Sequence, residues 1–187
     1  MASCKKEPSI TKGTFGYWSD MMCGDYVLTE VHWNGLAVDL NQDGRYRHYL
    51  IPELCSVNGY WEPDYTAQIE ESSIILEDYG PTLEVNFKVP YPDFRKDTDG
   101  TVYLNGVATF PMSVRYEYFA SIDNFKCQGR FYNFCYDESQ VFLDSIEDIQ
   151  IIEFGEGVVV VRFECSMFYV SAYTVDRGSL SYTFRKR

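Results

Sequence analysis

The feature of this sequence that most limits its fold is a strict alternation of apolar and polar residues. In residues 82–89, Leu, Val, Phe and Val alternate with Thr, Glu, Asn and Lys, and a second alternating run covers residues 114–123. Successive side chains of a β-strand point to opposite faces, so this alternation is typical of strands that bury one face. These segments therefore predict antiparallel strands with one face in the core and the other in water.

Turn signals such as Asn34-Gly35 and Asp99-Gly100 recur along the rest of the chain, and such dipeptides favour tight hairpins. We expect strands near residues 25–33, 60–70, 73–79, 82–89, 101–110, 113–123, 130–136, 149–154, 157–166, 168–175 and 179–185, and short helices at most in residues 46–54 and 141–146. An antiparallel meander of this size has to close on itself or stack as two sheets, because open edges pair with other chains. The predicted fold class is all-β, as a barrel or a flattened, barrel-like sandwich.

The composition agrees with a β fold and argues against one class of partner. Aromatic residues make up 17% of the chain, with 16 Tyr and 13 Phe, and such residues suit half-buried strands. The net charge of −12 would repel a phosphate backbone, so we expect no nucleic-acid partner. The apolar runs are too short to span a bilayer as a helix.

The N-terminus has the character of a tether with a modification site. Residues 1–13 are polar, and apolar residues become dense only afterwards, which predicts a flexible tether followed by a single domain over residues 14–187. Ser3-Cys4, followed by charged residues and a proline, resembles the start of a mature bacterial lipoprotein. This resemblance implies lipid attachment at Cys4, membrane contact through that anchor only, and a place in the cell envelope, in the periplasm or at the outer-membrane surface. A free cytoplasmic thiol and a cysteine of the fold are the alternatives.

Five further cysteines limit the disulfides without assigning them. They are Cys23, Cys55, Cys127, Cys135 and Cys165. An odd number permits at most two disulfides, and free buried thiols are equally compatible with this composition. Cys127 and Cys135 flank a turn-like segment and would be neighbours across a hairpin.

An acidic loop begins like the calcium loop of an EF-hand. Asp39, Asn41 and Asp43 place side-chain oxygens at loop positions 1, 3 and 5, and Gly44 permits the sharp turn at position 6. The backbone carbonyl of Arg45 can serve at position 7. This half of the motif predicts a structural Ca²⁺ ion.

The second half of the motif is incomplete. Position 12 holds Leu50 where a bidentate Glu is expected, and Arg47 at position 9 has no acceptor on its side chain. Glu53 is the nearest downstream carboxylate and can replace the missing ligand only if the residues before it fold back, for instance as a helical turn. The alternative is a hairpin turn in which Asn, Asp and Gly cap their own backbone.

The order of several short motifs resembles one known family. They are Gly24-x-Tyr26-x-Leu28-Thr29, Trp33-Asn34-Gly35, the acidic loop and Glu53-Leu54-Cys55, with Gly16-Tyr17-Trp18 as a second match to the G-x-W of lipocalins. Over residues 4–55 the chain resembles the N-terminal third of lipocalin-like lipoproteins of Bacteroidetes. The resemblance implies a lipocalin-like barrel with a calyx. It also implies a late basic residue near the tryptophan at the closed end, for which Arg185 is the C-terminal candidate.

No catalytic motif accompanies these features, so we expect that the protein is not an enzyme. His32 and His48 are the only imidazoles and suggest no triad order. We expect a binding protein for a small hydrophobic ligand, a glycan or a partner protein, or else an adhesin-like or accessory structural module. Candidate ligand-lining aromatics, which can equally be core residues, are Tyr60-Trp61, Tyr91, Phe94 and Phe168-Tyr169. An apolar cavity of several hundred Å³ would favour a carrier, and a packed interior would favour a module.

Overall fold

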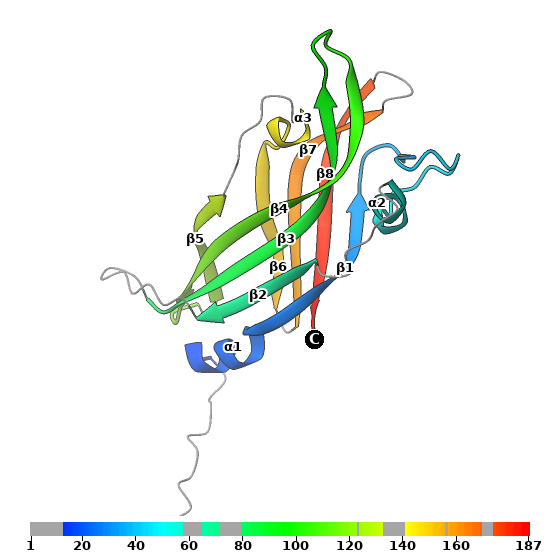
Figure 1. Ribbon diagram of the computed structural model, residues 1–187. Helices are drawn as coiled ribbons and strands as arrows, with labels where there is room; N and C mark the ends of the chain where they lie inside the picture. The colour runs from blue at the N-terminus through cyan, green and yellow to red at the C-terminus, as the bar shows by residue number, and fades with distance from the viewer. Residues whose placement is uncertain are drawn as a thin grey trace, which may run out of the picture.

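The computed structural model describes residues 13–57, 65–71, 80–122, 124–132, 141–155, 157–169 and 174–187. Its strands are β1 (Gly24–Trp33), β2 (Thr66–Glu71), β3 (Thr82–Lys96), β4 (Val102–Phe119), β5 (Asn124–Tyr132), β6 (Asp148–Gly155), β7 (Val158–Tyr169) and β8 (Thr174–Lys186). Three short helices are described: α1 (Phe15–Met22), α2 (Ile51–Val57) and α3 (Val141–Asp144). Within the described residues the strands form a single antiparallel sheet in the order β5-β4-β3-β2-β1-β8-β7-β6 (Figure 1). The expected all-β fold is confirmed.

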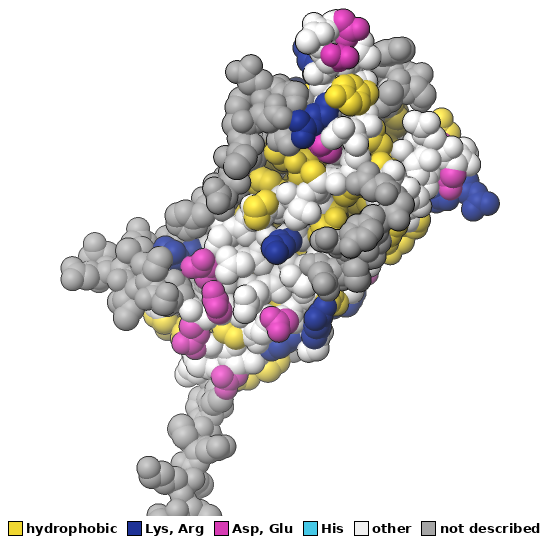
Figure 2. Space-filling view, in the orientation of Figure 1, with side chains coloured by type: hydrophobic (Ala, Val, Ile, Leu, Met, Phe, Trp, Pro, Cys, Tyr) yellow, Lys and Arg dark blue, Asp and Glu magenta, His cyan; other side chains and the backbone are white. Residues whose placement is uncertain are grey.

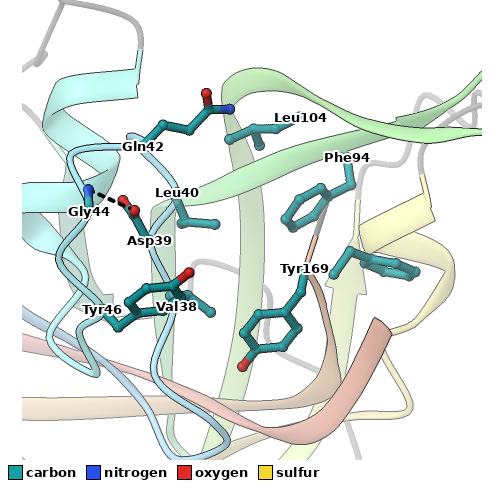
Figure 3. A pocket seen from close by; sticks show the side chains of 10 residues that line it. Val38, Asp39, Leu40, Gln42, Gly44, Tyr46, Phe94, Leu104 and Tyr169 are labelled. Carbon is teal, nitrogen blue, oxygen red and sulfur yellow. Dashed lines mark hydrogen bonds between the residues drawn. The ribbon is translucent and has the colours of Figure 1, made fainter. Parts of the chain in front are cut away.

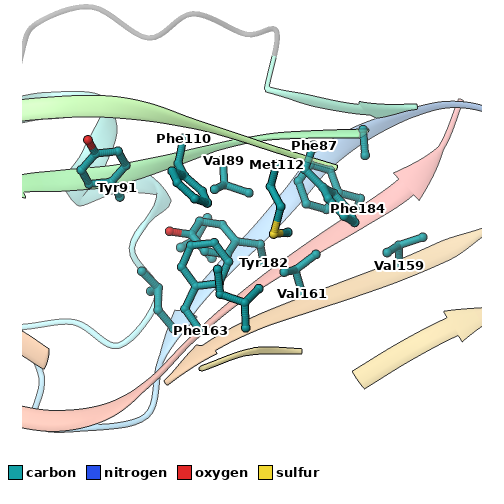
Figure 4. Close-up of a cluster of buried hydrophobic side chains, with 14 of the residues drawn as sticks. Phe87, Val89, Tyr91, Phe110, Met112, Val159, Val161, Phe163, Tyr182 and Phe184 are labelled. Carbon is teal, nitrogen blue, oxygen red and sulfur yellow. The ribbon is translucent and has the colours of Figure 1, made fainter. Parts of the chain in front are cut away.

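The sheet curls into a half-barrel, and side chains from distant strands meet inside it. The ring centroids of Phe87 in β3 and Phe184 in β8 are 5.5 Å apart, although β2 and β1 separate these strands in the sheet. Phe110 in β4 and Phe163 in β7 lie 5.8 Å apart in an edge-to-face arrangement. Figure 4 shows these rings converging between the two halves of the sheet. The curl therefore brings β3 and β4 opposite β7 and β8.

The interior of the half-barrel is filled by large side chains. Those at most 2% exposed include Tyr26, Phe87, Phe110, Phe163, Tyr182 and Phe184. The alternating residues Leu83, Val85, Phe87 and Val89 also point inward and are buried, as the periodicity predicted. Burial of each large apolar side chain contributes about 1.5–3 kcal/mol relative to exposure. A packed core, rather than a hollow calyx, occupies this part of the molecule.

Two predicted strand ends were wrong because prolines lie inside strands. β3 continues through Pro90 and Pro92, and β4 runs unbroken through Pro111. Within the described residues, β2 pairs with β3 only as far as Phe87, and β5 pairs with β4 from Met112 onward. Beyond these points the neighbouring segments lie outside the described residues, and a proline is compatible with a strand wherever its missing N–H is not part of a ladder.

The remaining predicted elements match in part. Of the strand expected at 130–136, residues 130–132 form the end of β5 and the rest lies outside the described residues. Of the strand expected at 168–175, residues 168–169 end β7, residues 174–175 begin β8, and those between lie outside the described residues. The predicted helix at 46–54 starts later, at Ile51, because the backbone before it bonds to β1: the N–H of Leu50 donates to the carbonyl of Val31 at 2.8 Å. The strand expected at 73–79 and the start of the one at 60–70 lie outside the described residues.

Helix α1, which the sequence pattern did not predict, packs against one end of the half-barrel. The side chain of Thr14 caps the helix by accepting a hydrogen bond from the N–H of Tyr17 at 3.3 Å. At its other end the buried hydroxyl of Tyr26 donates to the carbonyl of Met22 at 2.6 Å. In Figure 1 this end carries α1 and the C-terminus, whereas the hairpin between β3 and β4 projects from the opposite end.

The basic residue at the α1 end is Lys186, and the expectation for Arg185 is wrong. The Nζ of Lys186 donates to the carbonyl of Met21 at 2.9 Å, in the last turn of α1. The side chain of Arg185 is 55% exposed and pairs with Glu30 at 3.5 Å. Because neighbouring residues of a strand face opposite sides, only one of the two can reach the helix.

Candidate functional site

A pocket of about 440 Å³ is shown in Figure 3. The loop and strand ends that line it lie at the end of the half-barrel opposite α1 (Figure 1). Its lining comes from one loop and from the ends of three strands: Val38, Asp39, Leu40, Gln42, Gly44 and Tyr46 from the loop, Phe94 from β3, Leu104 from β4, and Phe168 and Tyr169 from β7. Segments far apart in the sequence therefore build it together.

The strand wall of the pocket is apolar and rigidly supported. Phe94 is fully buried, and its ring centroid lies 5.4 Å from that of Phe168. A bulge between Asp93 and Phe94 shifts the register of β3 against β4. The buried carboxylate of Asp93 accepts hydrogen bonds from the Nε of Arg95 at 2.9 and 3.0 Å and from the Nδ2 of Asn105 at 2.9 Å.

The opposite wall of the pocket is the acidic loop, whose two ends are joined by backbone hydrogen bonds. Val38 and Arg47 exchange two backbone hydrogen bonds, of 2.9 and 2.7 Å. Between them Gln42 and Gly44 adopt positive φ angles of 58° and 81°. A left-handed conformation is normal for glycine and strained for glutamine, so the surrounding contacts determine the shape of this turn. Tyr46, with 63% of its surface exposed, lies at the pocket rim.

The loop side chains cap the loop's own backbone. The two carboxylate oxygens of Asp39 accept hydrogen bonds from the N–H groups of Asp43 at 3.0 Å and Gly44 at 2.9 Å. Asn41 Oδ1 accepts from the N–H of Asp43 at 3.1 Å, and Asp43 Oδ1 accepts from that of Arg45 at 2.8 Å. This is the geometry expected of a turn built from Asn, Asp and Gly.

Glu53 folds back onto this loop through α2. Its carboxylate is fully buried and accepts hydrogen bonds from the N–H groups of Leu40 at 2.9 Å and Asn41 at 3.2 Å. The residue that was expected to replace the twelfth loop ligand is thus in contact with the loop, and a helical turn brings it there. A buried carboxylate needs such partners, because removing it from water is otherwise unfavourable.

The side chain of Arg47 lies at the centre of these acceptors. Its Nη2 donates to Asp43 Oδ2 at 2.9 Å, and its Nη1 contacts Asp43 Oδ1 at 3.3 Å and the carbonyl of Arg45 at 3.2 Å. Nη1 also bonds to the carboxylate of Glu53. These hydrogen bonds hold the pKa of Asp43 below its usual value and raise the pKa of Arg47.

Of the five candidate calcium ligands, Asp43, the carbonyl of Arg45 and Glu53 meet at the guanidinium of Arg47, whereas Asp39 and Asn41 accept hydrogen bonds from loop N–H groups. The role of Arg47 is the feature that sequence reasoning missed. Its place at loop position 9 was visible, but which acceptors it reaches depends on the fold. No group of three or more His, Cys, Asp or Glu side chains arranged to hold a metal was found in the described part of the chain. The predicted binding of calcium is not tested by these contacts.

Of the aromatic candidates, only some line the pocket. Phe94, Phe168 and Tyr169 do so, whereas Tyr91 stacks on Phe142 of α3 with ring centroids 5.3 Å apart. Residues 60 and 61 lie outside the described residues. Leu104 and Tyr46 were not foreseen, since nothing local distinguishes them from other strand and loop residues.

Comparison with protein-family models, with curated proteins and with solved structures found no match. The resemblance of residues 4–55 to lipocalin-like lipoproteins therefore stays a proposal. Among the described residues, no helix has the length and apolar character needed to cross a membrane.

Neither histidine lines the pocket. His32 is exposed beside Glu30, with 3.7 Å between Nε2 and the carboxylate. His48 places Nδ1 3.2 Å from the carbonyl oxygen of Trp33.

The structure describes the side chains of three of the cysteines. Cys23 and Cys55 are half-buried free thiols, and Cys165 is a buried free thiol. Burial raises the pKa of Cys165 to about 12. Cys4, Cys135 and the side chain of Cys127 lie outside the described residues, so lipid attachment stays a prediction and the pairing of Cys127 and Cys135 stays open.

The visible surface carries charges of both signs. In the view of Figure 2, hydrophobic side chains and some Lys and Arg side chains lie below the projecting tip of the β3–β4 hairpin, and acidic side chains gather toward the α1 end. The net charge of −12 disfavours polyanionic partners.

Proposed function

We propose that this protein is a non-enzymatic binding protein of the bacterial cell envelope, and that the pocket beside the acidic loop binds a small molecule with a flat apolar face and a polar edge. The observation that carries this proposal is the pocket of about 440 Å³ with aromatic walls. Its size lies within the range of about 300–1,000 Å³ typical of small-ligand sites. The ligand binds at the mouth, because packed side chains fill the interior.

The lining indicates the chemistry of the ligand. Tyr169 lines the strand side of the pocket and Tyr46 the loop side (Figure 3). Phe168 and the fully buried Phe94 complete the strand side of the lining. Gln42 adds an amide at the edge of the pocket, able to donate and accept hydrogen bonds. Aromatic rings beside such a polar group suit a sugar ring or a small neutral ring compound. The net charge of −12 disfavours an anionic ligand.

The placement of the pocket agrees with a lipid-anchored protein. Gly13, the first described residue, accepts a hydrogen bond at its carbonyl from the hydroxyl of Tyr118 at 2.8 Å, close to α1. The proposed lipid site, Cys4, precedes it by nine residues in the sequence. An anchor there would hold the α1 end toward the membrane and turn the pocket away from it.

Titration with neutral sugars and with an uncharged aromatic probe, followed by tyrosine and tryptophan fluorescence and by NMR, tests this proposal. Tyr46→Ala removes an exposed pocket residue with little effect on folding, and we expect binding about five- to tenfold weaker, because stacking on one ring is worth about 1–1.5 kcal/mol. The matched control is Tyr103→Ala, which removes a tyrosine 43% exposed that does not line the pocket. Equal weakening in both variants, or no binding of either probe class at millimolar concentration, would contradict the proposal.

A structural or accessory module is the second candidate, supported by the packed interior and by the β3–β4 hairpin. The turn of this hairpin carries Asp97 and Asp99, and Tyr103 on its stem is exposed. Binding to an envelope protein that is lost on mutation of Tyr103 but not of Tyr46 would favour the module.

A further inference from the structure

We propose that the guanidinium of Arg47 fills the position that a calcium ion occupies in an EF-hand loop, so that the native loop carries its own cation. This proposal does not depend on the ligand proposed for the pocket. It explains why a loop with most of a calcium motif holds an arginine at the ninth position.

The acceptors of Arg47 are the groups that would bind the metal. Asp43 provides the ligand of position 5, and the carbonyl of Arg45 provides that of position 7. Glu53 provides the carboxylate that the chain lacks at position 12. One guanidinium therefore satisfies three oxygen groups that an EF-hand directs at Ca²⁺.

The charges next to Arg47 also favour a cation at this place. The carboxylates of Asp43 and of the fully buried Glu53 both contact Arg47, whose side chain is 23% exposed. The carboxylate of Asp39 instead accepts hydrogen bonds from the N–H groups of Asp43 and Gly44. A planar guanidinium can bind both oxygens of one carboxylate and still reach a second acceptor, which a lysine ammonium does less well.

The position of Arg47 affects the pocket, because the loop that contains Arg47 forms one wall of the pocket. Leu40, whose N–H bonds to Glu53, lines the pocket together with Gly44 and Tyr46. The contact between Arg47 and Glu53 therefore joins the loop wall to α2. A calcium ion would hold this wall only while the metal is bound, whereas a covalently attached guanidinium holds it permanently.

The variant Arg47→Ser tests the proposal, because it removes the internal cation and opens the place for a metal. For the wild-type protein we expect the same Tm in EDTA and in millimolar CaCl₂. For Arg47→Ser we expect a lower Tm in EDTA and a rise of about 4 °C or more on addition of calcium, since binding to the folded state alone stabilises it. The variant should also bind Tb³⁺ with tyrosine-sensitised luminescence, given the nearby Tyr46.

Three further variants make the test specific. Arg45→Ser keeps the backbone carbonyl and all contacts of Arg47, so it should behave like the wild type. The double variant Arg47→Ser/Glu53→Gln should lose the calcium response. If Arg47→Ser does not fold in EDTA, refolding it with calcium gives the same answer, and Arg47→Lys should fold without a calcium response. A calcium-induced Tm rise in the wild type as large as in Arg47→Ser, or no calcium response in Arg47→Ser, would overturn the proposal.

Discussion

The hydroxyl of Tyr182 in β8 donates a hydrogen bond to the carbonyl oxygen of Pro90 in β3, with 2.7 Å between the two oxygens, across the interior of the half-barrel. Tyr182 is fully buried, and burial raises its pKa well above the usual value. This bond joins two strands that are not neighbours in the sheet, so it forms only when the sheet curls.

Tyr182→Phe should lower the free energy of unfolding by about 1–2 kcal/mol, because it removes one buried hydrogen bond and keeps the ring. Denaturant unfolding followed by circular dichroism measures this difference. The exposed control Tyr103→Phe should change stability by less than about 0.5 kcal/mol. Equal effects would show that the bond across the interior contributes nothing.

Gly178→Ala should destabilise the protein by about 1–3 kcal/mol through overpacking. A Cβ at this position would lie 2.5 Å from Asn34 Oδ1 and 3.0 Å from the ring of the buried Trp33. The same Asn34 oxygen accepts a hydrogen bond from the N–H of Ser179 at 2.5 Å, so it is not free to move away.

The matched control for this substitution is Gly155→Ala at the end of β6. A Cβ there has no neighbouring atom within 4 Å, so we expect a change of less than about 0.5 kcal/mol. Thermal unfolding of both variants in the same buffer tests the pair. A similar loss of stability in both variants would mean that the lost backbone freedom of glycine, and not the contact with Asn34, causes the destabilisation.

The contact between Asp43 and Arg47 predicts an acid-sensitive contribution to stability. Arg47 lowers the pKa of Asp43 in the folded state, so the unfolded state binds more protons between the lowered pKa and the usual value near 4. The contribution is complete above about pH 4 and is lost as the pH falls through the lowered pKa. Plots of Tm against pH should therefore fall less steeply below pH 4 in Asp43→Asn than in the wild type, and parallel curves would contradict this.

Cys165 should resist alkylation in the native protein. Burial raises its pKa to about 12, so a very small fraction is thiolate at pH 8, and the buried sulfur is inaccessible to the reagent. Iodoacetamide at pH 8 should modify the half-buried Cys23 and Cys55 first, and Cys165 only after unfolding in urea. Peptide mapping by mass spectrometry measures the three rates, and native labelling of Cys165 as fast as that of Cys23 would refute the expectation.

Strand positions were predictable where the information is local. Apolar and polar residues alternate in 82–89 because one face of the strand is buried, and this pattern predicted the first half of β3 correctly. The predicted strands stopped short of Pro90 and Pro111, which lie inside β3 and β4. A proline is compatible with a strand where its missing N–H is not part of a ladder, and that depends on strands elsewhere in the sequence.

The sequence by itself determined the all-β class, the acidic loop and the identity of Glu53 as the carboxylate nearest to it, because these depend on periodicity and short spacing. Only the tertiary structure decided that Arg47 lies among the loop's acceptors and that Phe94 and Phe168 meet the loop as pocket walls. The physical reason is that a contact between side chains requires their backbones to be held close together. For the pocket, that is achieved by the curl of a sheet whose strands come from the whole length of the chain.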